Sequence, residues 1–154
     1  MHDVAALSER MRAAGMRVTP QRQAIVRLLV GDTSHPTVEA LHDAVAAELP
    51  TVSLKTVYQT VHDLESLGEV RVLDVGTGSL RVDPNVETPH HHLVCTRCGA
   101  VRDVTPSVVA EVTSDDRRTF VIEAVEVVFR GHCETCPESS PSNPINRLPR
   151  PKES

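Results

Sequence analysis

Aromatic residues are nearly missing from this chain. Only 2% of its 154 residues are Phe, Trp or Tyr, and Trp is absent, whereas hydrophobic residues as a whole make up 40%. Any core must therefore be built from Val, Leu, Ile and Ala. Small units of this kind bury little surface and often need dimerisation or a bound metal. The length suits one or two compact units and excludes a large enzyme with a separate substrate domain.

Long apolar runs are also missing. No stretch approaches the roughly 20 residues that span a bilayer, and residues 1–12 are polar and mixed in charge, unlike a secretory signal. We therefore expect a cytoplasmic protein with no membrane partner. In that reducing compartment, closely spaced cysteine pairs bind metal or exchange thiols in preference to forming a disulfide scaffold.

The chain also lacks an excess of positive charge, since its net charge is −5. A uniformly acidic protein would bind nucleic acid poorly, but the charges here are unevenly distributed. Residues 10–31 contain five arginines and no acid, and residues 49–62 contain Lys55 and no acid. A basic surface is therefore expected within an acidic protein.

The first half of the chain has four predicted helices followed by a hairpin. Capping residues and apolar spacing give the starts of the helices: residue 3, Thr19, Thr37 and Ser53. Apolar runs at 70–73 and 80–82 flank Gly76-Thr77-Gly78, which predicts a β-hairpin. Helices followed by such a hairpin predict a winged helix-turn-helix domain over residues 1–83.

A second small unit is predicted beyond a hinge at residues 84–89, which holds two prolines and no apolar periodicity. The last strand of this unit, rich in β-branched residues, should leave an edge that pairs with a second copy. The predicted elements are strands at 93–94, 100–104 and 120–129 and a helix at 106–117. The fold class is thus α+β, with a C-terminal α/β dimerisation domain over 90–136 and a disordered tail over 137–154.

Two cysteine pairs have the spacing of a metal knuckle. Cys95 and Cys98 form one C-x-x-C pair, and Cys133 and Cys136 form another, with thirty-four residues between the two pairs. Together they supply the four thiolates of a tetrahedral zinc site, which is closed and therefore structural. A redox switch or thiol oxidoreductase could use the same thiols, and four unrelated buried cysteines are the plain alternative. The paired spacing favours zinc.

Three consecutive histidines precede the first cysteine pair. Alternate side chains of an extended segment share a side, so His90 and His92 can bind one ion while His91 faces away. Further candidate ligands lie at other element boundaries: His35, Asp83 and Asp103. Imidazole and carboxylate ligands suit Fe(II), Mn(II) or Zn(II) and do not choose among them. Spacing alone leaves open a surface histidine cluster with ordinary loop and capping residues.

The fourth predicted helix carries a polar stripe opposite its apolar face. Lys55, Tyr58, Gln59 and His62 stand at positions i, i+3, i+4 and i+7. A recognition helix in the major groove needs such donors, with Lys for phosphate and Gln or Tyr for base edges. An ordinary solvated helix face would show the same pattern.

In combination and in this order, these segments resemble the ferric uptake regulator family over roughly residues 5–136. Besides the cysteine pairs, the matching segments are 17–22 (RVTPQR), 35–37 (HPT), 53–58 (SLKTVY) and 90–95 (HHHLVC). The resemblance implies a homodimeric winged-helix repressor of double-stranded operator DNA. It also implies a structural Zn(II) and a regulatory Fe(II) or Mn(II) between the domains.

Roles for individual residues follow from the same resemblance. The regulatory ligands would be three histidines and two aspartates, as in the peroxide-sensing branch: His35, Asp83, His90, His92 and Asp103. The iron-uptake branch usually carries Glu in place of Asp103, and His35 and His90 would be the oxidation-sensitive residues. The DNA contacts would be Arg17, Gln21, Arg22, Lys55, Thr56, Tyr58 and Gln59.

The chain departs from the family pattern at a few positions. A further family site uses a histidine of the last strand, where this chain has Val125, so that site should be absent or altered. Gln59 replaces the Arg or Asn that relatives often carry after Tyr58, and Val82 replaces a frequent aromatic. We expect a non-enzymatic repressor that senses peroxide through its regulatory metal. The alternative is an iron- or manganese-availability repressor indifferent to peroxide.

Overall fold

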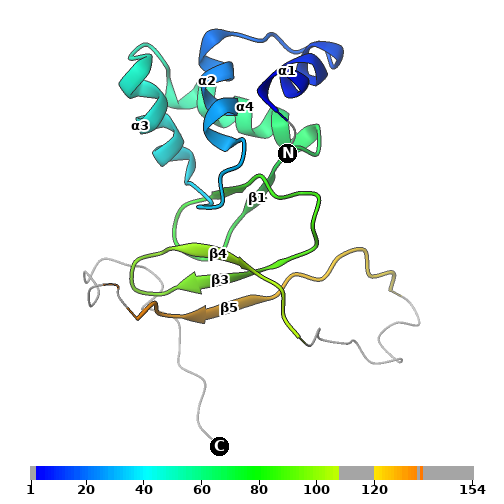
Figure 1. The fold of residues 1–154 in the computed structure, drawn as a ribbon, viewed down its shortest axis with the longest axis vertical. Coiled ribbons are helices and arrows are strands. Elements are labelled where there is room, and N and C mark those ends of the chain that lie inside the picture. Colours follow the sequence, from blue (N-terminus) through cyan, green and yellow to red (C-terminus); the bar gives the residue numbers. More distant parts are fainter. Residues whose placement is uncertain (1–2, 108–119, 135, 137–154) are drawn as a thin grey trace, which may run out of the picture.

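The computed structural model describes residues 3–107, 120–134 and 136. Four helices precede five short strands, and the helices gather at one end of the molecule while the strands lie at the other (Figure 1). The helices are α1 (Val4–Ala13), α2 (Pro20–Leu29), α3 (Val38–Glu48) and α4 (Leu54–Ser66). The strands are β1 (Arg71–Leu73), β2 (Arg81–Asp83), β3 (His91–Cys95), β4 (Val101–Val104) and β5 (Val128–Gly131). The α+β fold class is confirmed.

The helical unit, residues 3–83, starts its helices where the sequence predicts. Each predicted cap accepts a hydrogen bond at its hydroxyl from the backbone N–H three residues later, which satisfies one orphan donor of the first turn: Thr19, Thr37 and Ser53. Asp3 does the same for α1. The four helices share one aliphatic core, whose fully buried members include Leu7, Met11, Ile25, Leu29, Val57 and Leu64.

The β1–β2 hairpin is the predicted wing, and it joins two cores. Its strands pair antiparallel, and Gly76 and Gly78 take the positive φ values that its turn requires. Val82 packs into the core of the helices, whereas Leu73 and Val75 pack against the strands that follow. The wing accordingly lies between the helices and the three-stranded sheet (Figure 1).

The sheet unit comprises the described residues from 90 onward. Its strand order is β4-β3-β5, with β3 antiparallel to β4 and parallel to β5. Leu73 and Val75 of the wing complete a small core with Val94 and Val101. The proposed boundary at residues 84–89 stays a prediction.

The predicted strand at 120–129 is wrong over most of its length. Residues 120–127 are not in a strand, and β5 begins only at Val128. The register gives the reason, because β3 begins at His91 and β5 pairs from His92 onward, so earlier residues have no neighbouring strand. Propensity for β structure does not form a strand without a partner, and Phe120 and Val121 are 72% and 84% exposed.

Two further predictions fall largely or wholly outside the described residues. The helix expected at 106–117 is described only at residues 106–107, and the tail at 137–154 is not described at all. Among the described helices, none has the length and hydrophobicity needed to cross a membrane.

Candidate metal centres and nucleic-acid interface

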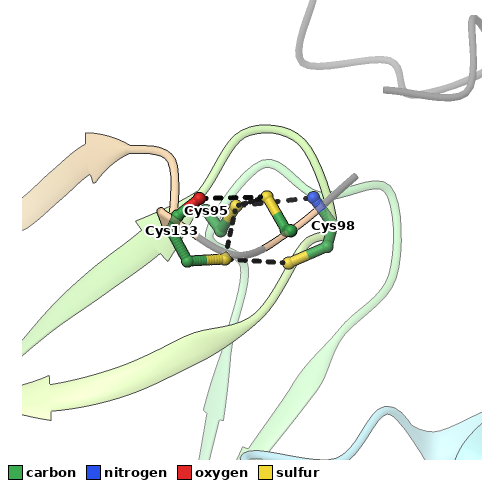
Figure 2. A group of neighbouring side chains, drawn as sticks. Cys95, Cys98 and Cys133 are labelled. Carbon is green, nitrogen blue, oxygen red and sulfur yellow. Dashed lines mark hydrogen bonds between the residues drawn. The ribbon is translucent and has the colours of Figure 1, made fainter. Parts of the chain in front are cut away.

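The four cysteine thiols meet at one point. The sulfur atoms of Cys98 and Cys133 lie 3.5 Å apart, those of Cys95 and Cys133 3.5 Å, and those of Cys95 and Cys136 3.6 Å. These distances are far longer than a disulfide bond of about 2.05 Å. Tetrahedral zinc, with bonds of about 2.3 Å, would separate its sulfur ligands by about 3.8 Å. Figure 2 shows three of these side chains turned toward one another, and the spacing fits zinc.

Strand register brings the two knuckles together. Cys95 ends β3 and pairs with Gly131 at the end of parallel β5, so the second cysteine pair begins beside the first. The backbone N–H of Thr96 donates to the Gly131 carbonyl at 2.7 Å and fixes this junction. Gly99 turns the chain back toward β4 with φ +74°, a conformation that disfavours any residue with a Cβ.

One thiol of the cluster is strongly acidic even before a metal is considered. Burial by itself raises the pKa of the Cys95 thiol, but backbone hydrogen bonds outweigh this effect and lower its pKa to about 5; they come from Cys98, Cys133 and Arg97. A hydrogen bond with Cys136, and then one with Cys95, raises the pKa of Cys133. The cluster thus supplies one ready thiolate, and a bound cation would favour deprotonation of the others.

The five predicted histidines and aspartates also come together. Nε2 of His35 lies 2.8 Å from Asp103 Oδ1 and 3.6 Å from Asp83 Oδ1. Nε2 of His90 lies 3.0 Å from Asp83 Oδ2, and Nε2 of His92 lies 3.8 Å from the same atom. All are buried except Asp103, whose side chain is 29% exposed. His35 belongs to the helical unit and the other histidines to the sheet unit, so this cluster spans both.

Two backbone carbonyls fix the tautomers of the cluster. Nδ1 of His90 lies 2.7 Å from the Thr88 carbonyl and Nδ1 of His35 lies 3.2 Å from the Thr33 carbonyl. A carbonyl can only accept, so each Nδ1 carries the hydrogen. In the neutral rings, Nε2 then presents a lone pair toward carboxylate oxygens. A divalent metal between them would satisfy both groups, because it takes imidazole nitrogen and carboxylate oxygen as ligands.

His92 strengthens the fit to a metal. Neither of its ring nitrogens makes a hydrogen bond within the described part of the chain, although both are buried. Burial lowers the pKa of His92, and the neighbouring His35 and His90 lower it further. The ring is therefore held neutral, which is the form that binds metals. Its Nδ1 lies 3.4 Å from Glu126 Oε1 without a hydrogen bond, and a buried nitrogen that lacks a hydrogen bond is costly unless a ligand satisfies it.

Asn85 is a site residue that sequence reasoning missed. Its backbone N–H donates to Asp83 Oδ1 at 2.7 Å, and its side-chain Nδ2 donates to Asp103 Oδ2 at 2.7 Å. One residue thereby orients both carboxylates of the cluster. The available signal was the sequence Asp-Pro-Asn at 83–85, because an aspartate followed by proline favours a turn closed by its own side chain.

Six of the seven predicted DNA contacts line one open groove of about 560 Å³ between the start of α2 and α4: Arg17, Gln21, Arg22, Lys55, Thr56 and Gln59. Asp63 shares this groove and holds two of them, Arg22 at 2.5 Å and Gln59 at 2.8 Å. The groove therefore carries basic side chains, and Asp63 orients two of its hydrogen-bond donors, Arg22 and Gln59.

Tyr58 is the seventh predicted contact, and the structure places it elsewhere. Its hydroxyl donates to Glu39 Oε1 of α3 at 2.8 Å, and Tyr58 is 41% exposed. This bond raises the pKa of Tyr58. The pKa of Glu39 is lowered by a hydrogen bond from the backbone N–H of Glu39 itself and, to a smaller extent, by the hydrogen bond from Tyr58. Tyr58 thus sits beside the groove lining, tied to α3.

The fold and these clusters define a winged-helix protein with a four-cysteine centre and a histidine–aspartate centre. Residues 13–129 match the ferric uptake regulator family. The chain belongs to that family.

Several known proteins align with most of this chain. The peroxide-responsive repressor PerR of Staphylococcus epidermidis is 33% identical over 130 residues, covering 83% of this chain and 86% of that repressor. The ferric uptake regulator Fur of Helicobacter pylori, described as having three functional metal binding sites, superposes with a TM-score of 0.68 at 19% identity, over 90% of this chain and 96% of that one. A zinc-bound manganese uptake regulator gives a TM-score of 0.64 at 26% identity, over 82% and 98%.

Proposed function

We propose that this protein is a metal-dependent transcriptional repressor that senses peroxide. One observation carries the proposal: His35 of the helical unit and His90 and His92 of the sheet unit converge, with two aspartates, on one buried point. A metal held there ties together a unit that binds DNA and a unit that does not. The S. epidermidis relative, named for its response to peroxide, supports the choice of signal.

Zinc would be held by Cys95, Cys98, Cys133 and Cys136 and would serve as scaffold. The sulfur distances suit a tetrahedral ion, and four protein ligands leave no open position. Because all four ligands belong to the sheet unit, we assign zinc the role of holding β3, β4 and β5 together.

Fe(II) or Mn(II) would be held by the histidine–aspartate cluster: His35, Asp83, His90, His92 and Asp103. The ligand set is nitrogen and hard oxygen, which suits both metals. Metal binding favours whichever arrangement of the two units brings His35 to the other ligands. It shifts that equilibrium only by its difference in affinity for the two arrangements.

Peroxide would act on the ligands themselves. Fe(II) in this cluster supplies the redox chemistry that reduces hydrogen peroxide, and Mn(II) does not. In the net change, one oxygen atom of the peroxide enters a ring C–H bond of His35 or His90 and the other leaves as water. An oxidised imidazole is a poorer ligand, so His35 or His90 would no longer hold the two units in the DNA-binding arrangement.

DNA binding would use the groove at α2 and α4 in a homodimer. Arg17, Arg22 and Lys55 supply the charge that contacts phosphates. Exposed apolar residues of 120–129 and Leu93 in the sheet unit offer the surface for a second copy. Two copies would place two such grooves on one duplex, as winged-helix dimers do on operator half-sites. We place the protein in the cytoplasm.

The test compares the iron and manganese forms of the full chain. An operator is first selected from a random duplex library with the Mn(II) form, and binding is followed by fluorescence anisotropy. Stoichiometric hydrogen peroxide should release DNA from the Fe(II) form alone, with one added oxygen atom on a peptide containing His35 or His90 by mass spectrometry. Release by chelator but not by peroxide would establish instead an iron- or manganese-availability repressor.

A further inference from the structure

Arg81 of β2 connects the two metal centres. Its Nη1 donates to the backbone carbonyl of His35 at 3.2 Å, and its Nη2 donates to the carbonyl of Gly99 at 2.6 Å. His35 is a ligand candidate of the histidine–aspartate cluster, and Gly99 directly follows Cys98 in the first cysteine knuckle. The Arg81 guanidinium therefore links the backbone of one centre to the backbone of the other.

The His35 end of this bridge is a strained backbone. His35 has φ +51°, and it is the one residue other than glycine with a positive φ in the described part of the chain. This conformation is unfavourable for a residue with a side chain. It persists only if its surroundings hold it, and β2 does so, because Val82 N–H donates to the Pro36 carbonyl at 2.9 Å beside the Arg81 bond.

The Gly99 end depends on the cysteine knuckle. Gly99 N–H donates to the Cys95 carbonyl at 2.9 Å, so the turn between Cys95 and Cys98 sets the position of the Gly99 carbonyl. The contact is close: a Cβ at Gly99 would lie 3.2 Å from Arg81 Nη2. A change in the geometry of the knuckle therefore moves the acceptor on which Arg81 depends.

We propose that Arg81 is a positioning residue that makes the regulatory metal affinity depend on the zinc centre, although the two centres share no ligand. Zinc holds the knuckle, the knuckle holds the guanidinium, and the guanidinium holds His35 in its left-handed conformation for ligation. This proposal rests on the proposed function, because it requires a metal at the histidine–aspartate cluster. Coupling of this kind is reciprocal, so regulatory metal should also strengthen the equilibrium binding of zinc.

Arg130 provides a matched control within the same chain. Its Nη1 donates to the Val75 carbonyl of the wing at 2.6 Å, so it too joins the two units through an arginine–carbonyl bond. This bond leads to neither the His35 loop nor Gly99. Loss of Arg130 tests general docking of the units, whereas loss of Arg81 tests the position of His35.

The experiment is a calorimetric titration of the zinc-loaded full chain with Mn(II). Arg81→Gln should weaken Mn(II) binding by about tenfold, as loss of a residue that orients metal ligands does, with zinc content unchanged. Arg81→Lys should fall between Gln and the parent, because one ammonium does not reproduce the two-carbonyl fork. Arg130→Gln should stay within about twofold of the parent. Amide exchange of residues 33–37 in the Mn(II)-free chain should be faster in Arg81→Gln only.

Four outcomes would overturn the proposal. The first is that Arg81→Gln keeps the Mn(II) affinity and the amide exchange of the parent, and the second is that Arg130→Gln weakens Mn(II) binding as much as Arg81→Gln does. The third is that Arg81→Gln loses zinc, and the fourth is that Arg81→Lys binds Mn(II) no more tightly than Arg81→Gln. A parent chain that binds no Mn(II) would overturn the proposed function and this inference with it. The proposed function survives all four of the former results, so the two failures are distinguishable.

Discussion

The two metal clusters of this protein are built in opposite ways. The cysteine cluster takes all four ligands from the sheet unit, at the adjacent ends of β3 and β5. The histidine–aspartate cluster takes His35 from the loop before α3 and Asp83 from the wing. It takes His90 from the residue before β3, His92 from β3 and Asp103 from β4. A cluster within one unit stabilises that unit, whereas a cluster spanning two units sets their relation. The first suits a scaffold and the second a switch.

Exposure and ligand chemistry follow the same division. Cys95 is buried, but Cys98 is exposed and Cys133 and Cys136 are only partly buried, whereas His35 and His92 are 1% exposed. Soft thiolates bind zinc tightly and leave no open position, while nitrogen and oxygen ligands suit an exchangeable divalent ion. The buried cluster is thus the one whose occupancy can change the packing between the units.

Removing a cysteine should have the largest effect. Cys98→Ser should lose zinc and unfold the sheet unit, because structural zinc contributes about 10 kcal/mol or more to small domains, as much as the whole stability of a typical domain. Zinc analysis and a circular dichroism melt measure this. The chelated parent is the control and should match the variant. A Cys98→Ser chain with one zinc and the parent's melting temperature would break the division between scaffold and switch.

Removing a buried histidine should abolish regulatory binding and leave the scaffold intact. His92→Ala should weaken Mn(II) binding by at least about 100-fold, more than changes to surrounding residues do, with zinc content unchanged. Titration calorimetry and zinc analysis measure the two centres separately. His91→Ala is the control from the opposite side of β3 and should retain Mn(II) affinity. Joint loss of both metals in His92→Ala would show that the clusters are one structural centre.

Asn85 should have an intermediate effect. Asn85→Ala removes the Nδ2 donor to Asp103 but keeps the backbone donor to Asp83, so the regulatory affinity should fall by about tenfold. The same titration measures it, with Asn85→Asp as a second variant that removes the donor and adds repulsion. Tighter Mn(II) binding by either variant would contradict the role of Asn85 in orienting the carboxylates of the histidine–aspartate cluster.

Lys55, which lines the groove and belongs to neither cluster, should have the smallest effect. Lys55→Ala should weaken operator binding severalfold at low salt and reduce the salt dependence by about one counterion, with both metals retained. Anisotropy titrations at several salt concentrations measure this. Arg27→Ala is the control with the same charge change outside the groove. An unchanged salt slope for Lys55→Ala would contradict the assignment of the groove to DNA.

The sequence pointed to the candidate ligands because their chemistry is local. C-x-x-C spacing, alternate histidines and capped helices each depend on a few neighbouring residues. It placed the last strand too early because strand formation at 120–127 depends on a partner, and β3 begins only at His91. It also missed the Tyr58–Glu39 bond, which joins two helices whose packing no local pattern predicts.

The sequence by itself determined the helices, the wing and the identity of the candidate ligands, because caps, periodicity and ligand spacing act over a few residues. Only the tertiary structure decided how the candidate ligands meet, within the sheet unit for the cysteines and across both units for the histidines and aspartates. Parallel pairing of β5 with β3 closes the cysteine cluster, and the wing packed between both cores brings His35 to His90. The bonds of Asn85 and Arg81 arise the same way, since they join residues that are distant in the chain and meet only after packing.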